Sequence, residues 1–125
     1  MGINSTEVSY GFGQLGSTYQ DAAAGVQIIP PTNKVWIAIT MLEDTTFDAI
    51  GGLSAQRINL SGTDNDIYIG TDQPSHDLAS GSETVHEGSG GKVVDGVTFP
   101  KGITIYGRWT NIEVATGGVI AYVGD

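Results

Sequence analysis

Short runs of β-branched and aromatic residues, separated by glycine and proline, recur along this sequence and predict β-strands. The strongest run covers residues 34–42, where side chains alternate between two faces. One face carries Val35, Ile37, Ile39 and Met41, and the other carries Trp36, Ala38, Thr40 and Leu42. Because both faces are largely apolar, we predict a central strand that is covered on both sides.

Further strands are predicted at intervals of about 8–12 residues, which is typical of a sandwich or barrel. They cover residues 25–29, 45–50, 67–69, 93–99, 103–109, 112–115 and 119–123. Residues 53–60 fit either a helical turn or a strand. No run has the period of an amphipathic helix, so the pattern predicts an all-β fold, a single-domain antiparallel sandwich or jelly-roll-like barrel.

The chain divides into a glycine-rich N-terminal arm over residues 1–24 and a β domain over residues 25–125. The arm combines glycines with large apolar side chains, but it lacks a pattern that would bury them in a strand or helix. Within the domain, residues 70–91 are rich in Gly, Ser, Asp, Glu and His and predict a long, exposed polar loop. A length of 125 residues fits one domain that builds its own core.

Composition and charge exclude several classes of partner. The chain has 19 glycines, no cysteine and a formal net charge of −9. Its five cations are scattered along the sequence: Lys34, Arg57, Lys92, Lys101 and Arg108. Nucleic acids and anionic membranes attract clustered cations, so we expect neither as a partner. The lack of cysteine excludes a disulfide framework and thiolate chemistry.

Residues 11–16 match the G-x-G-x-x-G pattern of dinucleotide sites. Such a site needs a strand before the motif and a helix after it, and residues 17–21 do not read as an amphipathic helix. The glycines therefore favour turns, and we expect no cofactor. The interleaved Tyr10, Phe12 and Leu15 are the predicted partner-binding residues, because such side chains offer a large contact area at modest entropic cost.

Residues of the kinds used in catalysis and metal binding occur without the spacing that those functions need. His76 and His86 lie in the polar loop among acidic residues, but their spacing follows no zinc pattern. Residues 75–77, Ser-His-Asp, are adjacent and point in different directions, unlike a catalytic triad. Residues 64–66, Asp-Asn-Asp, begin like a calcium loop but lack its required glycine and glutamate, so weak calcium binding is only an alternative to a solvated turn. We expect no catalytic residues, no metal site and no enzymatic activity.

Arg108 and Trp109 follow Gly107 within a predicted strand, and two interpretations remain open. In the first, the pair forms a cation–π contact or anchors an interface. In the second, which we favour, Gly107 marks a β-bulge and Trp109 belongs to the core.

Several segments resemble a family of small virion proteins of tailed bacteriophages, especially marine ones. The resemblance lies in residues 10–16, in the "KVWIAITMLEDTTF" run of residues 34–47, and in residues 99–110 and 117–124. These segments keep the family order and encode strands and turns. Residues 70–91 look like a variable insertion.

The resemblance implies a head-associated or capsid decoration protein, commonly a trimer of β-domains. We therefore expect a virion structural protein that binds itself, as a homotrimer, and the major capsid protein of the head lattice. The alternative is a receptor- or glycan-binding tip module of a phage tail or fibre, because glycine-rich β-domains with exposed Trp and Tyr also bind glycans.

Overall fold

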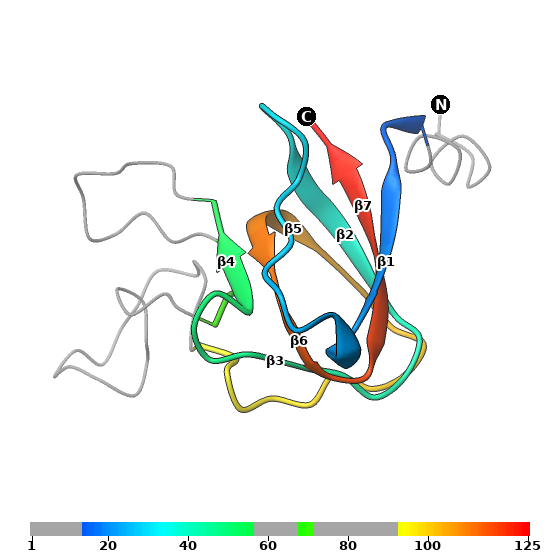
Figure 1. Ribbon diagram of the computed structural model, residues 1–125, viewed down its shortest axis with the longest axis vertical. Coiled ribbons are helices and arrows are strands. Elements are labelled where there is room, and N and C mark those ends of the chain that lie inside the picture. Colours follow the sequence, from blue (N-terminus) through cyan, green and yellow to red (C-terminus); the bar gives the residue numbers. More distant parts are fainter. Residues whose placement is uncertain (1–13, 57–67, 72–92) are drawn as a thin grey trace, which may run out of the picture.

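The computed structural model describes residues 14–56, 68–71 and 93–125 (Figure 1). Its elements in chain order are β1 (Ser17–Asp21), the 3₁₀ helix η1 (Ala22–Ala24), β2 (Val35–Met41), β3 (Thr46–Phe47), β4 (Leu53–Ala55), β5 (Thr104–Ile112), β6 (Val114–Thr116) and β7 (Gly118–Gly124). The described chain is all-β, as the sequence pattern predicts.

Five strands form one antiparallel sheet in the order β1-β7-β2-β5-β4, and β3 pairs with β6 in a smaller sheet. β2 is the middle strand, which confirms the central position predicted for residues 34–42. The predicted cover on both sides is wrong, because no described element lies over the side of the sheet that faces away from the core. The segment 25–33 runs in front of β2 and β5 in Figure 1, and Ile28 forms a bridge with Ile112. Together with the β3–β6 pair, this segment makes a second layer, so the fold is an antiparallel, sandwich-like one.

The N-terminal arm was predicted to reach residue 24, but its last part belongs to the β domain. Residues 17–21 form β1, which pairs in uniform register with β7 and belongs to the sheet. β1 ends because the Asp21 side chain accepts a hydrogen bond from the Ala23 backbone N–H at 3.1 Å and caps η1. Gly25, at φ 61°, then closes η1 in the left-handed conformation that glycine adopts at low cost. Tertiary pairing with β7 therefore turned a segment without a clear pattern into a strand.

The other predicted strands differ from the observed ones mainly in length. Residues 45–50 contain only the two-residue β3, and residues 53–60 begin with β4. Residues 25–29 and 93–99 each contribute a single bridge in place of a strand, at Ile28 and Phe99. Residues 68 and 69 are not in a strand. The last three predicted strands correspond to β5, β6 and β7 with shifted boundaries.

The polar loop predicted over residues 70–91 begins with two residues that are buried. Thr71 donates its backbone N–H to the Leu53 oxygen at 3.0 Å, and its Oγ1 accepts the Leu53 N–H at 2.9 Å. The oxygen of Gly70 accepts the N–H of Val94 at 2.9 Å. Composition suggested exposure, but these backbone bonds to β4 hold the start of the loop against the domain. Residues 72–91 lie outside the described residues.

β5 carries irregularities that bend it around the core. Trp36 pairs with Trp109 but Ala38 pairs with Tyr106, so two residues of β5, Gly107 and Arg108, oppose the single Ile37. The register with β4 also shifts, between Ser54 and Ala55. Bulges bend and twist the strand that contains them. After Ile112 the chain therefore continues through one residue into β6 of the smaller sheet.

The core lies between the five-stranded sheet and the second layer. Its buried members are Trp36, Ile39, Met41, Phe47, Leu53, Ala55, Phe99, Trp109, Ile112, Val114, Val119, Ala121 and Val123. Phe47 and Phe99 meet edge to face, with ring centroids 5.7 Å apart. Both tryptophans satisfy their indole N–H groups on backbone oxygens, Trp36 on Ile28 at 3.2 Å and Trp109 on Ile69 at 2.8 Å. Dispersion and apolar burial here provide the main drive for folding.

Trp109 shows why its strand contains Gly107. The indole ring lies so close to Gly107 that a Cβ at that position would be 2.7 Å from the ring. Trp109 is fully buried. Of the two interpretations of Arg108 and Trp109, the bulge with a core tryptophan is therefore correct. No helix in the described part of the chain is long and apolar enough to cross a membrane.

Candidate functional site

The face of the large sheet that points away from the core carries two rows of paired side chains. One row consists of Ser17, Tyr122, Ala38 and Tyr106, and the next of Tyr19, Ile120, Thr40 and Thr104. Residues paired directly across an antiparallel sheet share a face, and the residues between these two rows belong to the core side. We call these two rows the outer face.

Two of the large side chains on the outer face are well exposed to solvent. Tyr19 is 62% exposed and Tyr106 is 64% exposed. Tyr122 and Ile120 are half-buried. Ala38 is only 1% exposed although it lies in the first row, so larger neighbouring side chains cover it. The outer face is therefore a continuous surface of aromatic, aliphatic and threonine side chains on a regular β-scaffold.

Hydroxyl groups on the outer face are ordered by hydrogen bonds. The Oγ1 atoms of Thr40 and Thr104 are 2.8 Å apart, across the β2–β5 pair. The hydroxyl of Tyr19 donates to Oδ2 of Asp21 at 3.3 Å. The negative charge of Asp21 is the main cause that raises the pKa of Tyr19 above 10.0, with smaller contributions from burial and Glu43. Tyr19 therefore stays protonated and neutral, and its ring suits contact with another molecule.

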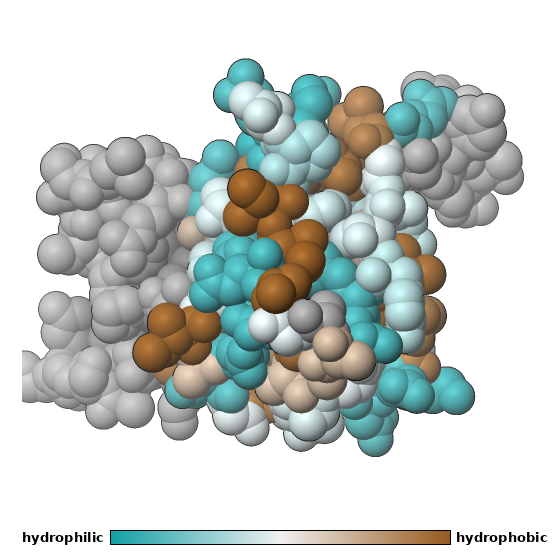
Figure 2. All heavy atoms as spheres, in the orientation of Figure 1, coloured by the Kyte–Doolittle hydropathy of each residue, from teal (hydrophilic) through white to brown (hydrophobic). Residues whose placement is uncertain are grey.

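A second apolar patch lies on the opposite layer of the molecule. Figure 2 shows hydrophobic atoms gathered where the segment 25–33 crosses the front of the domain. Val26 and Ile29 are the exposed apolar side chains of this segment, and Ile50 is exposed as well. These side chains belong to irregular segments, whereas the outer face is formed by paired strands.

Of the partner-binding residues predicted in the arm, the structure describes only Leu15. It is 46% exposed and precedes Gly16, whose oxygen accepts the Val123 N–H at 2.9 Å. Tyr10 and Phe12 lie outside the described residues. The role of the three as anchors stays a prediction.

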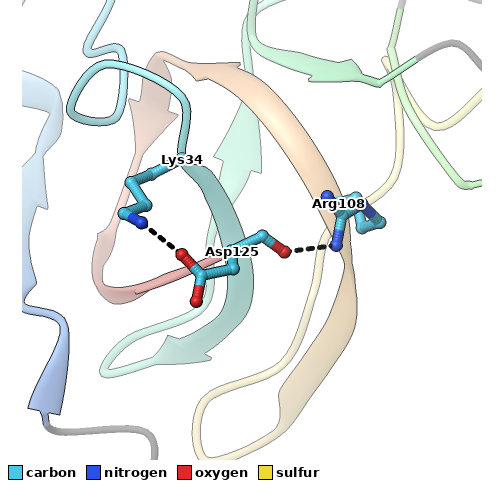
Figure 3. Close-up of polar contacts among 3 residues, drawn as sticks. All are labelled: Lys34, Arg108 and Asp125. Carbon is cyan, nitrogen blue, oxygen red and sulfur yellow. Dashed lines mark hydrogen bonds and ion pairs between the residues drawn. The ribbon is translucent and has the colours of Figure 1, made fainter.

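Arg108 and Lys34 both contact Asp125, at the end of β7 (Figure 3). Nη1 of Arg108 donates to the backbone oxygen of Asp125 at 2.7 Å, and Nζ of Lys34 pairs with the Asp125 carboxylate. Nε of Arg108 also donates to Oε1 of Gln56 at 2.6 Å. These bonds connect residues in or next to β7, β2, β5 and β4, so Arg108 serves the fold. The exposed ion pair contributes little on its own.

Glu113 and Asp48 form a close acidic pair in the second layer. The pKa of Glu113 is raised above 4.5, first by its hydrogen bond with Asp48, then by desolvation and by the Asp48 charge. Among the described residues, no three His, Asp or Glu side chains come close enough together to hold a metal ion. The candidates His76, His86, 75–77 and 64–66 lie outside the described residues.

Comparisons with protein-family models, with curated proteins and with solved structures found no match to this chain. The resemblance to phage virion proteins therefore stays a prediction from the sequence.

Sequence reasoning did not single out the tyrosines of the outer face. In each of the three strands the tyrosine alternates with residues that face the core, and this alternation can be seen in the sequence alone. Their convergence depends on the strand order and on the register between strands 17–21, 104–112 and 118–124. Neither can be read from a single sequence, because the three strands lie far apart along the chain.

Proposed function

We propose that this protein is a non-enzymatic structural domain that acts by binding other protein subunits through the outer face. The observation that carries this proposal is the pair of tyrosines, Tyr19 and Tyr106, each more than 60% exposed on a regular sheet. Exposed aromatic side chains on a rigid scaffold are enriched at protein interfaces, since little entropy is lost when they become buried. The high net negative charge disfavours nucleic acid as the partner of this face.

In its finer form, the proposal is a capsid decoration protein of a tailed bacteriophage, located in the virion and bound to the major capsid protein. The resemblance of residues 99–110 and 117–124 to phage virion proteins supports it, and these segments contain Tyr106 and Tyr122 of the outer face. The resemblance also suggests a homotrimer. On a lattice, repeated weak contacts from many copies add up to strong attachment.

A binding experiment with capsid shells that lack this chain tests the proposal. The double variant Tyr19→Ser with Tyr106→Ser removes two aromatic contacts, and we expect its affinity for shells to fall at least about tenfold, since buried aromatic anchors contribute about 1–3 kcal/mol each. The matched control, Val26→Ser with Ile29→Ser, removes exposed apolar groups from the opposite layer and should bind as the wild type does. Equal binding by wild type and the tyrosine variant would contradict the proposal, and mass spectrometry of purified virions would test the location.

A second candidate, the glycan- or receptor-binding tip module, is favoured by one observation. Tyr106 lies next to the hydrogen-bonded hydroxyls of Thr40 and Thr104 on the outer face. Aromatic faces stack on sugar rings, and neighbouring hydroxyls can bond sugar hydroxyls. A glycan array probed with wild type and Tyr106→Ser separates the candidates: a glycan signal that the variant loses supports the tip module, and shell binding without any glycan signal supports the decoration protein.

A further inference from the structure

The two edges of the large sheet differ in how their backbone groups are satisfied. At the β4 edge, Thr71 exchanges hydrogen bonds with Leu53 at 3.0 and 2.9 Å and covers the strand. At the β1 edge, no hydrogen bond from any described residue reaches the outward backbone groups of Tyr19. A strand edge with unpaired N–H and C=O groups is a template for another strand.

The register of β1 shows which groups point outward. The Val123 N–H bonds to the oxygen of Gly16 at 2.9 Å, and β1 pairs with β7 without a bulge. Hydrogen bonding alternates along an antiparallel pair, so Thr18 and Gln20 face β7 through their backbone. The backbone groups of Ser17 and Tyr19 and the N–H of Asp21 therefore face the open edge, whereas the oxygen of Asp21, the N-cap residue, serves η1. β1 has no proline and no bulge, which are common devices that block edge pairing.

We propose that β1 pairs antiparallel with β1 of a second copy of this chain, about a two-fold axis at Tyr19. In this register Tyr19 opposes Tyr19 of the other copy, and Ser17 opposes Asp21. The Tyr19 N–H of each copy then meets the Tyr19 oxygen of the other, and each Asp21 N–H meets a Ser17 oxygen. The result is one continuous sheet across both copies, with a closed, isologous interface.

Side chains support this particular register. The Ser17 hydroxyl, which is exposed, would donate to the Asp21 carboxylate of the other copy, and the two Asp21 carboxylates stand apart at opposite ends of the contact. The two Tyr19 rings lie side by side on the outer face, which favours pairing across strands. The inference goes beyond the proposed function and does not depend on a capsid. It does predict that two outer faces join into one larger surface.

Net charge opposes this association, since each copy carries −9. Salt screens such repulsion over about 10 Å at 0.1 M ionic strength. We expect the purified chain to form dimers, or larger assemblies with an even number of copies, in place of the homotrimer that the resemblance suggests. A hexamer of three β1-paired dimers would combine the two. We also expect association to strengthen as salt is added. Light scattering coupled to size-exclusion chromatography measures this. A wild-type chain that stays monomeric at high concentration and high salt would overturn the proposal.

Substitution of residue 19 tests the backbone pairing directly. Tyr19→Pro removes an N–H that points away from β7, and proline is tolerated in edge strands on that side. Tyr19→Val is the matched control, because it removes the same ring but keeps the N–H. We expect Tyr19→Pro to weaken self-association at least about tenfold, and Tyr19→Val to weaken it less than about threefold. Equal effects of the two variants, or none from proline, would contradict edge pairing.

A second pair of variants tests the register and does not depend on whether proline is tolerated. Ser17→Lys would place an ammonium opposite Asp21 of the other copy, and Ser17→Asp would place two carboxylates opposite each other. We expect the lysine variant to tighten self-association and the aspartate variant to weaken it, each by about threefold to tenfold, as for cross-strand charge pairs. Shifts of the same sign in both variants would exclude this register. Tyr19→Val also separates the two proposals, because it should reduce shell binding while the dimer persists.

Discussion

The two faces of the same five-stranded sheet differ in what covers them. On the core side, Met41, Trp109 and Val119 are buried, and the segment 25–33 and the β3–β6 pair form the second layer there. On the outer face, the same strands present tyrosine and threonine side chains, and no described element lies over them. Both faces contain aromatic groups, so composition does not distinguish them. The second layer decides which aromatic side chains stabilise the fold and which remain able to bind a partner.

The largest expected contrast between the faces lies within β5. Trp109→Ala should lower the free energy of unfolding by about 3–5 kcal/mol, because it opens a cavity and leaves the Ile69 oxygen without its 2.8 Å bond. Tyr106→Ala, on the outer face, should cost less than about 1 kcal/mol. Urea unfolding of the two variants measures both values. Similar losses would mean that the outer face is packed as tightly as the core.

Adding a methyl group to the core side should also destabilise the fold. Gly107→Ala places a Cβ 2.7 Å from the Trp109 ring, and we expect a loss of about 1–3 kcal/mol from overpacking. Gly96→Ala is the control, since no atom lies within 4 Å of the added Cβ, and its effect should stay within about 0.5 kcal/mol. A tolerated Gly107→Ala would show that the β5 bulge can relax.

Isosteric substitution of two threonines compares a buried hydrogen bond with one on the outer face that water can reach. Thr71→Val leaves the buried Leu53 N–H without its acceptor, which should cost about 1–3 kcal/mol. Thr40→Val removes the 2.8 Å bond to Thr104 on the outer face, where water can replace it, and should cost about 0.5–1 kcal/mol. Thermal unfolding of both variants shows which one loses more stability. A larger loss for Thr40→Val would mean that the outer face is shielded from water.

The smallest expected effect concerns the Glu113–Asp48 pair in the second layer. Folding raises the pKa of Glu113, so the folded chain holds this proton more tightly than the unfolded chain does. Its contribution favours folding below pH 4.5 and is lost as pH rises through the raised value. Glu113→Gln, which keeps a hydrogen-bonding group, should therefore slightly raise the thermal midpoint at about pH 7 and leave it unchanged at about pH 4.

Asp95→Asn is the matched control for this pH test, because it removes an equal charge at an exposed position of another segment. If the thermal midpoint rises equally in both variants, the effect comes from net charge and not from the Asp48 contact.

The sequence by itself determined the class of fold and its central element. Period-2 patterning and glycine turns predicted an all-β domain, and the doubly apolar run 34–42 became the middle strand β2. The spacing of Gly107 and Trp109 already favoured a bulge with a buried indole. These features are local, since they follow from which side chains alternate and where glycine interrupts them.

Only the tertiary structure decided which exposed residues form a surface. Residues 17–21 have little apolar pattern of their own and are a strand because β7 pairs with them, and Thr71 is buried because β4 bonds to it. Tyr19, Tyr106 and Tyr122 meet on one face through pairings that connect distant parts of the chain. Alternation assigns each side chain to one of two faces, but register sets its neighbours and the second layer excludes water from one face alone.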